Sequence, residues 1–191
     1  MTILPAFLAL TALNTQTLSA HNDFEFGVDS ISVYAEVVSM PKSKSSYTFK
    51  QGQIYYKGDK VWKWRQDDSI PITKMASVTL DVNGKIIELS TQMIEGIIDI
   101  HLFEKTIIRS GRKPSPLKQT FLMCSGSASG RNWRLFIPCS DAGGGFGILF
   151  SGTLGSKSIE RQVFIESKMV EKKVFLASDA VTCRVNQRHL T

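Results

Sequence analysis

The sequence predicts an all-β fold with one short helix near residues 91–98, and three observations support this prediction. Val, Ile, Phe and Thr recur in short runs, and these residue types favour strands. Glycine is frequent, at 14 of 191 residues, and turn residues separate the runs. Many short strands at such spacing predict an antiparallel sandwich or a strongly curved, partly open barrel.

The chain begins with a segment typical of a secretory signal. Residues 1–20 contain no Asp, Glu, Lys or Arg, and an apolar run, Ile3–Leu13, precedes a polar stretch that ends at Ala20. This order predicts a signal peptide over residues 1–20 and a single β-rich domain over residues 21–191, in a secreted or periplasmic protein. A buried N-terminal strand or helix is the alternative. No later segment is long and apolar enough for a membrane helix.

Residues 53–65 are predicted to form a hairpin that turns at Gly58-Asp59. The alternation along both strands places Tyr55, Trp62 and Trp64 on one face and cations on the other. The predicted pairs are Tyr56–Val61, Tyr55–Trp62 and Ile54–Lys63.

Residues 78–89 carry the strongest structural signal. Asn83-Gly84 fits a two-residue turn in which both residues have positive φ. A slip of one residue would mix the apolar and polar faces, so the register is well specified. The predicted pairs are Val82–Lys85, Leu80–Ile87 and Val78–Leu89.

The predicted helix lies within Ser90–Asp99, where apolar residues follow a helical stripe and Ser90 or Thr91 can cap the first turn. Gly96 weakens this helix. The turn segments that separate the remaining strands are 111–116, 125–130 and 140–147. The remaining predicted strands are Ile31–Val38, Lys105–Ser110, Leu117–Met123, Asn132–Ile137, Ile148–Thr153, Gln162–Glu166, Lys173–Ala177 and Val181–Val185.

Three cysteines, Cys124, Cys139 and Cys183, allow three disulfide pairings. In an oxidising compartment two of them should pair, and Cys124–Cys139 is preferred because it closes the shortest loop. Such a bridge would contribute about 3 kcal/mol through the unfolded state. Cys183 is the alternative partner, and the third cysteine is expected to be buried.

No motif in the chain predicts catalysis, a metal ion or a cofactor. None of the three histidines stands in a cysteine-enzyme signature, and no Cys or His pair has the spacing of metal ligands. Gly143–Gly147 leads into an expected strand rather than a helix, so a phosphate-binding loop is not predicted. The sequence therefore favours a non-enzymatic protein over a hydrolase.

The net charge of +6 is distributed in blocks. Residues 21–40 sum to −4 and residues 66–104 to −5, whereas residues 41–65 sum to +6. Residues 105–118 contain five cations and no acid. Whether the basic blocks meet on one surface depends on the fold.

Cations alternate with aromatic residues from Lys42 to Arg65, a combination that suits an anionic glycan, lipid headgroups or an acidic protein. Nucleic acid is not expected. The competing interpretation is that the aromatic residues are core and the lysines face solvent. The candidate binding residues are Lys57, Lys60, Trp62, Lys63, Trp64 and Arg65.

Phe49–Tyr56 followed by Val61–Trp64 resembles the early strands of periplasmic outer-membrane lipoprotein carriers, with Lys63 where that family has Arg. The resemblance implies an unclosed barrel with an apolar cavity for acyl chains. The leading prediction is a secreted or periplasmic, non-enzymatic binding protein that contacts an anionic partner through the basic-aromatic hairpin. A carrier of a lipid or other apolar ligand is the alternative.

Overall fold

The computed structural model describes residues 16–50, 53–61, 73–97, 100, 102–109, 115–139 and 146–176. Within these ranges the chain forms 14 strands, one single-turn α-helix and one 3-10 turn at Lys44–Ser46. The strands make four antiparallel sheets, none of which closes into a barrel. The predicted all-β class is therefore confirmed, and the arrangement is consistent with an antiparallel sandwich.

The first layer of the sandwich is a four-stranded sheet in the order β1-β2-β6-β7. Alternate residues of its strands face inward, as Ile31, Val33 and Ala35 do, and these are fully or nearly fully buried. The hairpin predicted over residues 78–89 is confirmed with its register, including the pair Leu80–Ile87. The strands are β1 (Thr17–Phe26), β2 (Asp29–Ser39), β6 (Thr73–Val82) and β7 (Lys85–Leu89).

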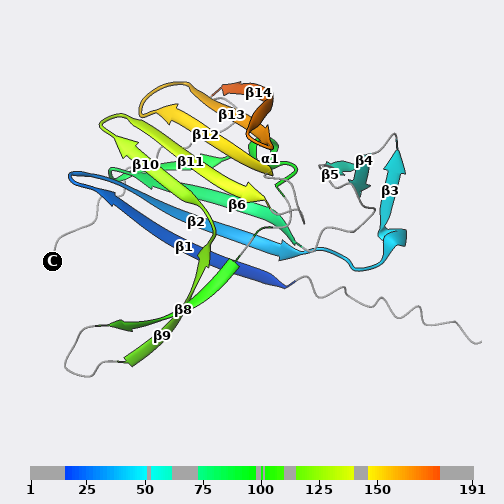
Figure 1. Ribbon diagram of the computed structural model, residues 1–191, viewed down its shortest axis with the longest axis horizontal. Coiled ribbons are helices and arrows are strands. Elements are labelled where there is room, and N and C mark those ends of the chain that lie inside the picture. Colours follow the sequence, from blue (N-terminus) through cyan, green and yellow to red (C-terminus); the bar gives the residue numbers. More distant parts are fainter. Residues whose placement is uncertain are drawn as a thin grey trace, which may run out of the picture.

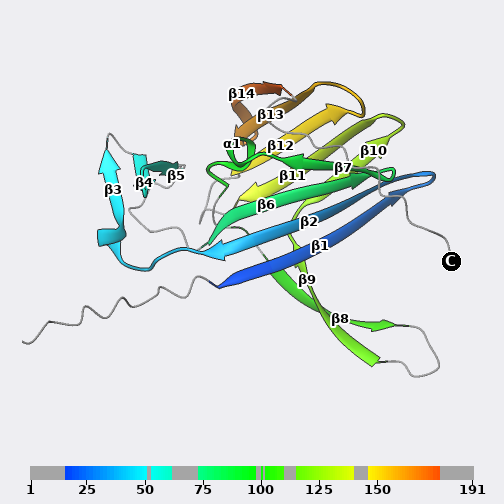
Figure 2. The same ribbon diagram turned by 180° about the vertical axis from the view of Figure 1, so that it is seen from behind.

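The second layer is a five-stranded sheet in which each strand pairs with the next along the chain (Figures 1 and 2). The turn predicted at residues 125–130 is wrong, because residues 125–129 form a strand and the chain turns at Gly130-Arg131. The strands are β10 (Ser125–Ser129), β11 (Asn132–Cys139), β12 (Phe146–Thr153), β13 (Ser158–Ile165) and β14 (Lys168–Leu176).

One apolar core fills the space between the two layers. Trp133, Leu135 and Phe150 from the second layer lie in the same buried cluster as the inward residues of the first. Burying each such side chain contributes about 1.5–3 kcal/mol. Gly152 leaves room for Trp133, since a Cβ there would lie 2.7 Å from the indole ring. The core is therefore closely packed.

The helix α1 (Thr91–Ile94) follows β7 and is shorter than predicted. Ser90 caps it as expected, accepting a hydrogen bond from the Met93 amide. It ends after one turn because Gly96 has a φ of +77°, which a right-handed helix does not allow. Arg161 of β13, itself buried, donates to the Glu95 carbonyl at 2.9 Å and so joins this segment to the second layer.

A small sheet of β3 (Tyr47–Lys50), β4 (Gln53–Tyr56) and β5 (Asp59–Val61) lies between β2 and β6 in sequence. The predicted hairpin exists here, but its turn is Lys57-Gly58 rather than Gly58-Asp59. Both turn residues have positive φ, and Tyr56 consequently pairs with Asp59 instead of Val61. The predicted register was therefore wrong by two residues along the second strand.

The strands β8 (Leu102–Arg109) and β9 (Ser115–Leu122) form a two-stranded ribbon, here called the arm, which projects away from the sandwich (Figures 1 and 2). Asn22 of β1 anchors its base. The buried Asn22 amide donates to the Leu122 carbonyl and accepts from the Leu122 N–H, both at 2.9 Å. The side chain thus replaces one residue of a β-ladder.

Three turns meet at one end of the sandwich through Asn83. Its side chain accepts a hydrogen bond from the Ser30 N–H at 2.7 Å and donates to Asp29 and to the Gly130 carbonyl, each at 2.9 Å. Asp29 in turn accepts from the Gly130 N–H. The two layers are therefore joined by polar contacts at their rim as well as by the core.

Strand β1 begins at Thr17, four residues before the predicted signal cut. Thr17 pairs with Val38, and Ala20 is buried. The cut after Ala20 stays a prediction, and it would remove this part of the strand. In the part of the chain that the structure describes, no helix has the length and apolar character needed to cross a membrane.

Candidate functional site

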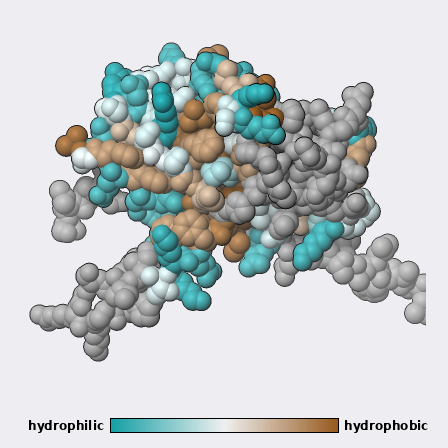
Figure 3. Space-filling view, viewed as in Figure 1, coloured by the Kyte–Doolittle hydropathy of each residue, from teal (hydrophilic) through white to brown (hydrophobic). Residues whose placement is uncertain are grey.

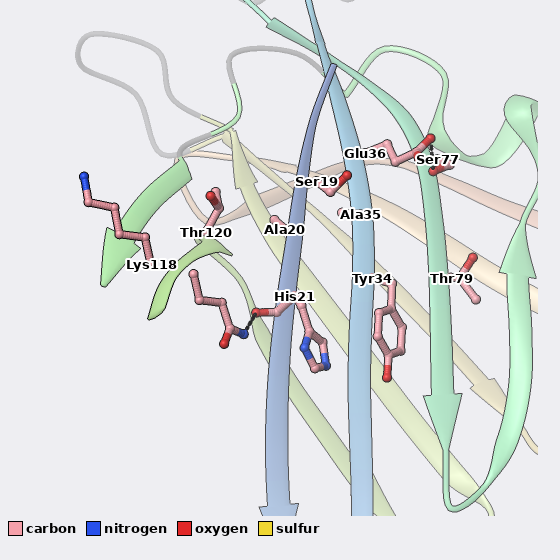
Figure 4. Close-up of a pocket in the computed structure, with 11 residues that line it drawn as sticks. Ser19, Ala20, His21, Tyr34, Ala35, Glu36, Ser77, Thr79, Lys118 and Thr120 are labelled. Atoms are coloured by element: carbon pink, nitrogen blue, oxygen red, sulfur yellow. Dashed lines mark hydrogen bonds between the residues drawn. The ribbon is translucent and has the colours of Figure 1, made fainter. Parts of the chain in front are cut away.

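A groove of about 550 Å³ lies on the outer face of the first sheet, between its strands and the base of the arm (Figure 4). Strands β1, β2, β6 and β9 all contribute side chains. The volume is within the usual range for a small-molecule site. The lining residues are Ser19, Ala20, His21, Tyr34, Ala35, Glu36, Ser77, Thr79, Lys118, Gln119 and Thr120.

The centre of the groove is a pair of stacked rings. His21 of β1 pairs directly with Tyr34 of β2, and both side chains face outward because inward and outward residues alternate along each strand. The ring centroids are 4.4 Å apart and the ring planes differ by 7°. Tyr34 is 42% exposed. Each ring therefore covers one face of the other, and the exposure of Tyr34 leaves part of its ring open to solvent.

Polar neighbours hold the ring pair in place. Asp23 Oδ1 accepts a hydrogen bond from His21 Nε2 at 2.9 Å and another from Ser32 Oγ at 2.6 Å. On the other side of Tyr34, Ser77 Oγ donates to Glu36 Oε2 at 3.2 Å. Since the side chains of His21 and Glu36 have partners within the sheet, their positions are set before any ligand binds.

The arm supplies the remaining wall of the groove. Gln119 Nε2 of β9 donates to the His21 carbonyl at 3.3 Å, and this hydrogen bond is drawn in Figure 4. Lys118 and Thr120 flank Gln119 on the same strand and complete the lining. The groove therefore spans two parts of the fold, the sandwich and the arm.

His21, Asp23 and Ser32 resemble the residue set of a serine hydrolase, but their order in space differs. In a Ser-His-Asp relay the imidazole lies between the hydroxyl and the carboxylate. Here the Asp23 carboxylate lies between the other two groups, and Ser32 donates its proton to Asp23 rather than to His21. This geometry orients the ring and does not activate a nucleophile.

The predicted basic-aromatic binding residues lie elsewhere in the fold or outside the described residues. Lys57 is at the β4–β5 turn, where its ammonium group is 5.4 Å from the centroid of the Tyr56 ring. Lys60 belongs to β5, and its side chain lies outside the described residues, as do Trp62, Lys63, Trp64 and Arg65. Neither Lys57 nor Tyr56 lines the groove.

The predicted Cys124–Cys139 disulfide is not formed. Because β10 pairs with β11 in the register Ser125–Phe136, the backbone at Cys124 is level with Ile137, and Cys139 lies further along. Cys139 instead ends β11, and its thiol donates weakly to the Ile137 carbonyl at 3.8 Å. Burial raises the pKa of Cys124 to about 12. Cys183, the alternative partner, lies outside the described residues.

A second hollow, of about 350 Å³, lies where α1 meets the ends of β2 and β6, and it is lined mainly by apolar groups from Val38, Met40 and Ile94. Among the side chains that the structure describes, no group of three or more His, Cys, Asp or Glu could hold a metal ion. Comparisons of the chain with protein-family models, with curated proteins and with solved structures found no match.

Proposed function

We propose that this chain is a non-enzymatic binding protein that holds a saccharide in the groove of His21 and Tyr34. The observation that carries the proposal is the exposed ring pair, stacked 4.4 Å apart and surrounded by hydroxyl, amide and carboxylate groups. A sugar ring has an apolar C–H face and a rim of hydroxyl groups. The open part of the Tyr34 ring offers a surface for that face, and the polar neighbours offer partners for the rim.

The hydrogen-bonding groups around the rings favour a polyol over other small ligands. Glu36 can accept from sugar hydroxyl groups and Lys118 can donate to sugar oxygens, while hydroxyls such as Thr79 can do both. Donors and acceptors are thus mixed on all sides of an aromatic surface.

The interior of the sandwich supports a surface site over a carrier. Among the described residues, the space between the two layers is occupied by buried side chains such as Trp133, Leu135 and Phe150. An acyl chain would need an open volume there. Secretion or export stays part of the proposal, since extracellular and periplasmic proteins meet free glycans.

Calorimetric titration with a panel of neutral and charged oligosaccharides tests this function. Replacing Tyr34 by Ala should weaken binding about tenfold or more, because it removes the exposed aromatic ring that the sugar would contact. The fold should persist, as Tyr34 points away from the core. Phe49→Ala is the matched control, because Phe49 is a similarly exposed aromatic residue of β3 and does not line the groove. The proposal fails if no saccharide binds, or if Tyr34→Ala binds as the unchanged protein does.

A further inference from the structure

We propose that the saccharide is an anionic glycan, and that Lys118, midway along the arm, binds the acidic group of the sugar next to the one on Tyr34. This inference rests on the proposed function and names the class of ligand. It comes from the position of the arm, from its charge, and from the charge of the sheet on the other side of the groove.

The arm is the only wall of the groove whose described lining side chains include a lysine. Lys118 and Thr106 are paired residues on one face of the ribbon, and the Lys118 side chain is 81% exposed. Its nearest acid is Glu104, at 4.0 Å, and that carboxylate is also largely exposed. A contact of this length between exposed groups is weak, so the Lys118 ammonium group can still bind a ligand.

The rest of the arm reinforces this positive charge. Of the five cations among residues 105–118, Lys105 and Arg109 belong to β8 and Lys118 to β9, and these strands project from the sandwich (Figure 1). A basic ribbon that stands clear of the body attracts anions from a distance, on the scale of a Debye length of roughly 8 Å at physiological salt.

Aromatic contacts hold the two strands of the arm together near its base. Phe103 and Phe121 stack with centroids 5.4 Å apart, and the Lys105 ammonium group is 5.3 Å from one ring and 5.6 Å from the other. Phe103 is 40% exposed, and Figure 3 shows hydrophobic surface where the arm meets the sandwich. Figure 4 shows the Lys118 side chain extending away from the ring pair, so this exposed side chain has to turn toward the groove to meet a ligand on Tyr34.

The sheet on the opposite side of the groove is acidic. Glu36 lines the groove, and Asp23, Asp81 and Glu88 share the outward face of the first sheet. An anionic polymer would be repelled along that face and attracted toward the arm. A glycan bound on Tyr34 should therefore extend out of the groove on the side of Lys118. Its first charged group should then bind the Lys118 ammonium group.

The decisive experiment compares a hyaluronan hexasaccharide with its carboxyl-reduced form, which has the same sugar backbone without the charges. Calorimetric titrations at low and at physiological salt should show the charged form binding about tenfold more tightly, with an affinity that falls as salt rises. Lys118→Glu should remove this difference between the two forms. Lys168→Glu is the matched control, because Lys168 is an exposed lysine of β14, remote from the groove lining.

The outcomes separate this inference from the proposed function. If both forms bind equally and Lys118→Glu changes neither, the ligand is a neutral saccharide, and the inference is overturned while the proposed function stands. If neither the hexasaccharides nor the neutral panel bind, both fail. If vesicles of phosphatidylglycerol bind through Lys118 and no saccharide does, the partner is a lipid surface, and both are again overturned.

Discussion

Cys124 lies against the core immediately before β10, in surroundings that disfavour a negative charge. Burial raises its pKa from the usual 9.0 to about 12. The folded protein therefore holds the thiol proton more firmly than the unfolded chain does. The stability that this shift contributes is fully present below about pH 9 and is lost as the pH rises through about 12.

We expect Cys124 to react slowly with iodoacetamide at pH 8 in the folded protein, because the thiolate is the reactive form. In denaturant it should react at the rate of an ordinary thiol. Mass mapping of alkylated peptides over time measures the two rates at this residue. Rapid labelling of Cys124 in the folded protein would show that the thiol is not buried as described.

Single residues were the least predictable part of this molecule. The three cysteines invite a bridge between the nearest two, but the register of the β10–β11 hairpin places Cys124 opposite Ile137, and composition does not encode that register. His21 and Tyr34 lie 13 residues apart, and nothing in either segment alone marks a site. The turn at Gly27 could have indicated this pair, since a hairpin centred there places His21 opposite Tyr34. Assigning the residues up to Ala20 to a signal peptide hid the first of those two strands.

Among the elements, β1 bears most directly on how the chain is processed. Its first four residues pair with Ala35–Val38, and Ala20 is part of the core. Ser19 and Ala20 also line the groove. A cut after Ala20 would therefore remove both ladder contacts and part of the proposed site.

A chain that starts at His21 should be less stable than one that starts at Gln16, by about 1–3 kcal/mol, because it lacks several ladder hydrogen bonds and the buried Ala20. Thermal unfolding of the two chains measures the difference. Equal midpoints would show that the part of β1 before His21 contributes nothing to stability. The N-terminus of protein from the native host, read by mass spectrometry, then tells which chain exists in the cell.

The two predicted hairpins show what turn chemistry can and cannot specify. Asn83-Gly84 allows only one position for the turn, and the predicted register of that hairpin is correct at every pair. In the other hairpin, Gly58 can occupy either turn position, and the pattern does not say that Lys57 takes the first. The arm was predicted as two separate strands because the residues between them, 110–114, carry Gly and Pro but no pairing signal.

At the scale of the whole molecule, the all-β class followed from composition and turn spacing, whereas the sheet order did not. Strand β2 pairs with β6, which lies beyond the inserted β3–β5 sheet. Alternation tells which face of a strand is buried and not which distant strand lies beside it. The groove combines β1, β2, β6 and β9, so it could not be assembled before that order was known.

Asn83→Gly should lower the free energy of unfolding by about 1–2 kcal/mol while leaving a single cooperative transition. Glycine keeps the positive φ of this turn and removes the side-chain bonds to Ser30, Asp29 and Gly130. Lys57→Gly is the matched control, because it makes the same backbone change at a turn where the described side chains form no such hydrogen bonds. Thermal unfolding followed by calorimetry measures both. Equal midpoints for the two variants would mean that the rim contacts contribute nothing to stability.

The position of the groove across the sandwich and the arm has a thermodynamic consequence. A two-stranded ribbon is marginally stable by itself, so the arm should unfold locally at a lower free energy than the sandwich. A ligand that contacts both Tyr34 and Lys118 binds fully only when the arm is folded. By linkage, the free energy by which the folded arm strengthens ligand binding equals the free energy by which the bound ligand stabilises the arm. Occupancy of the groove and order of the arm are therefore linked equilibria, and conditions that melt the ribbon would release the ligand while the sandwich remains intact.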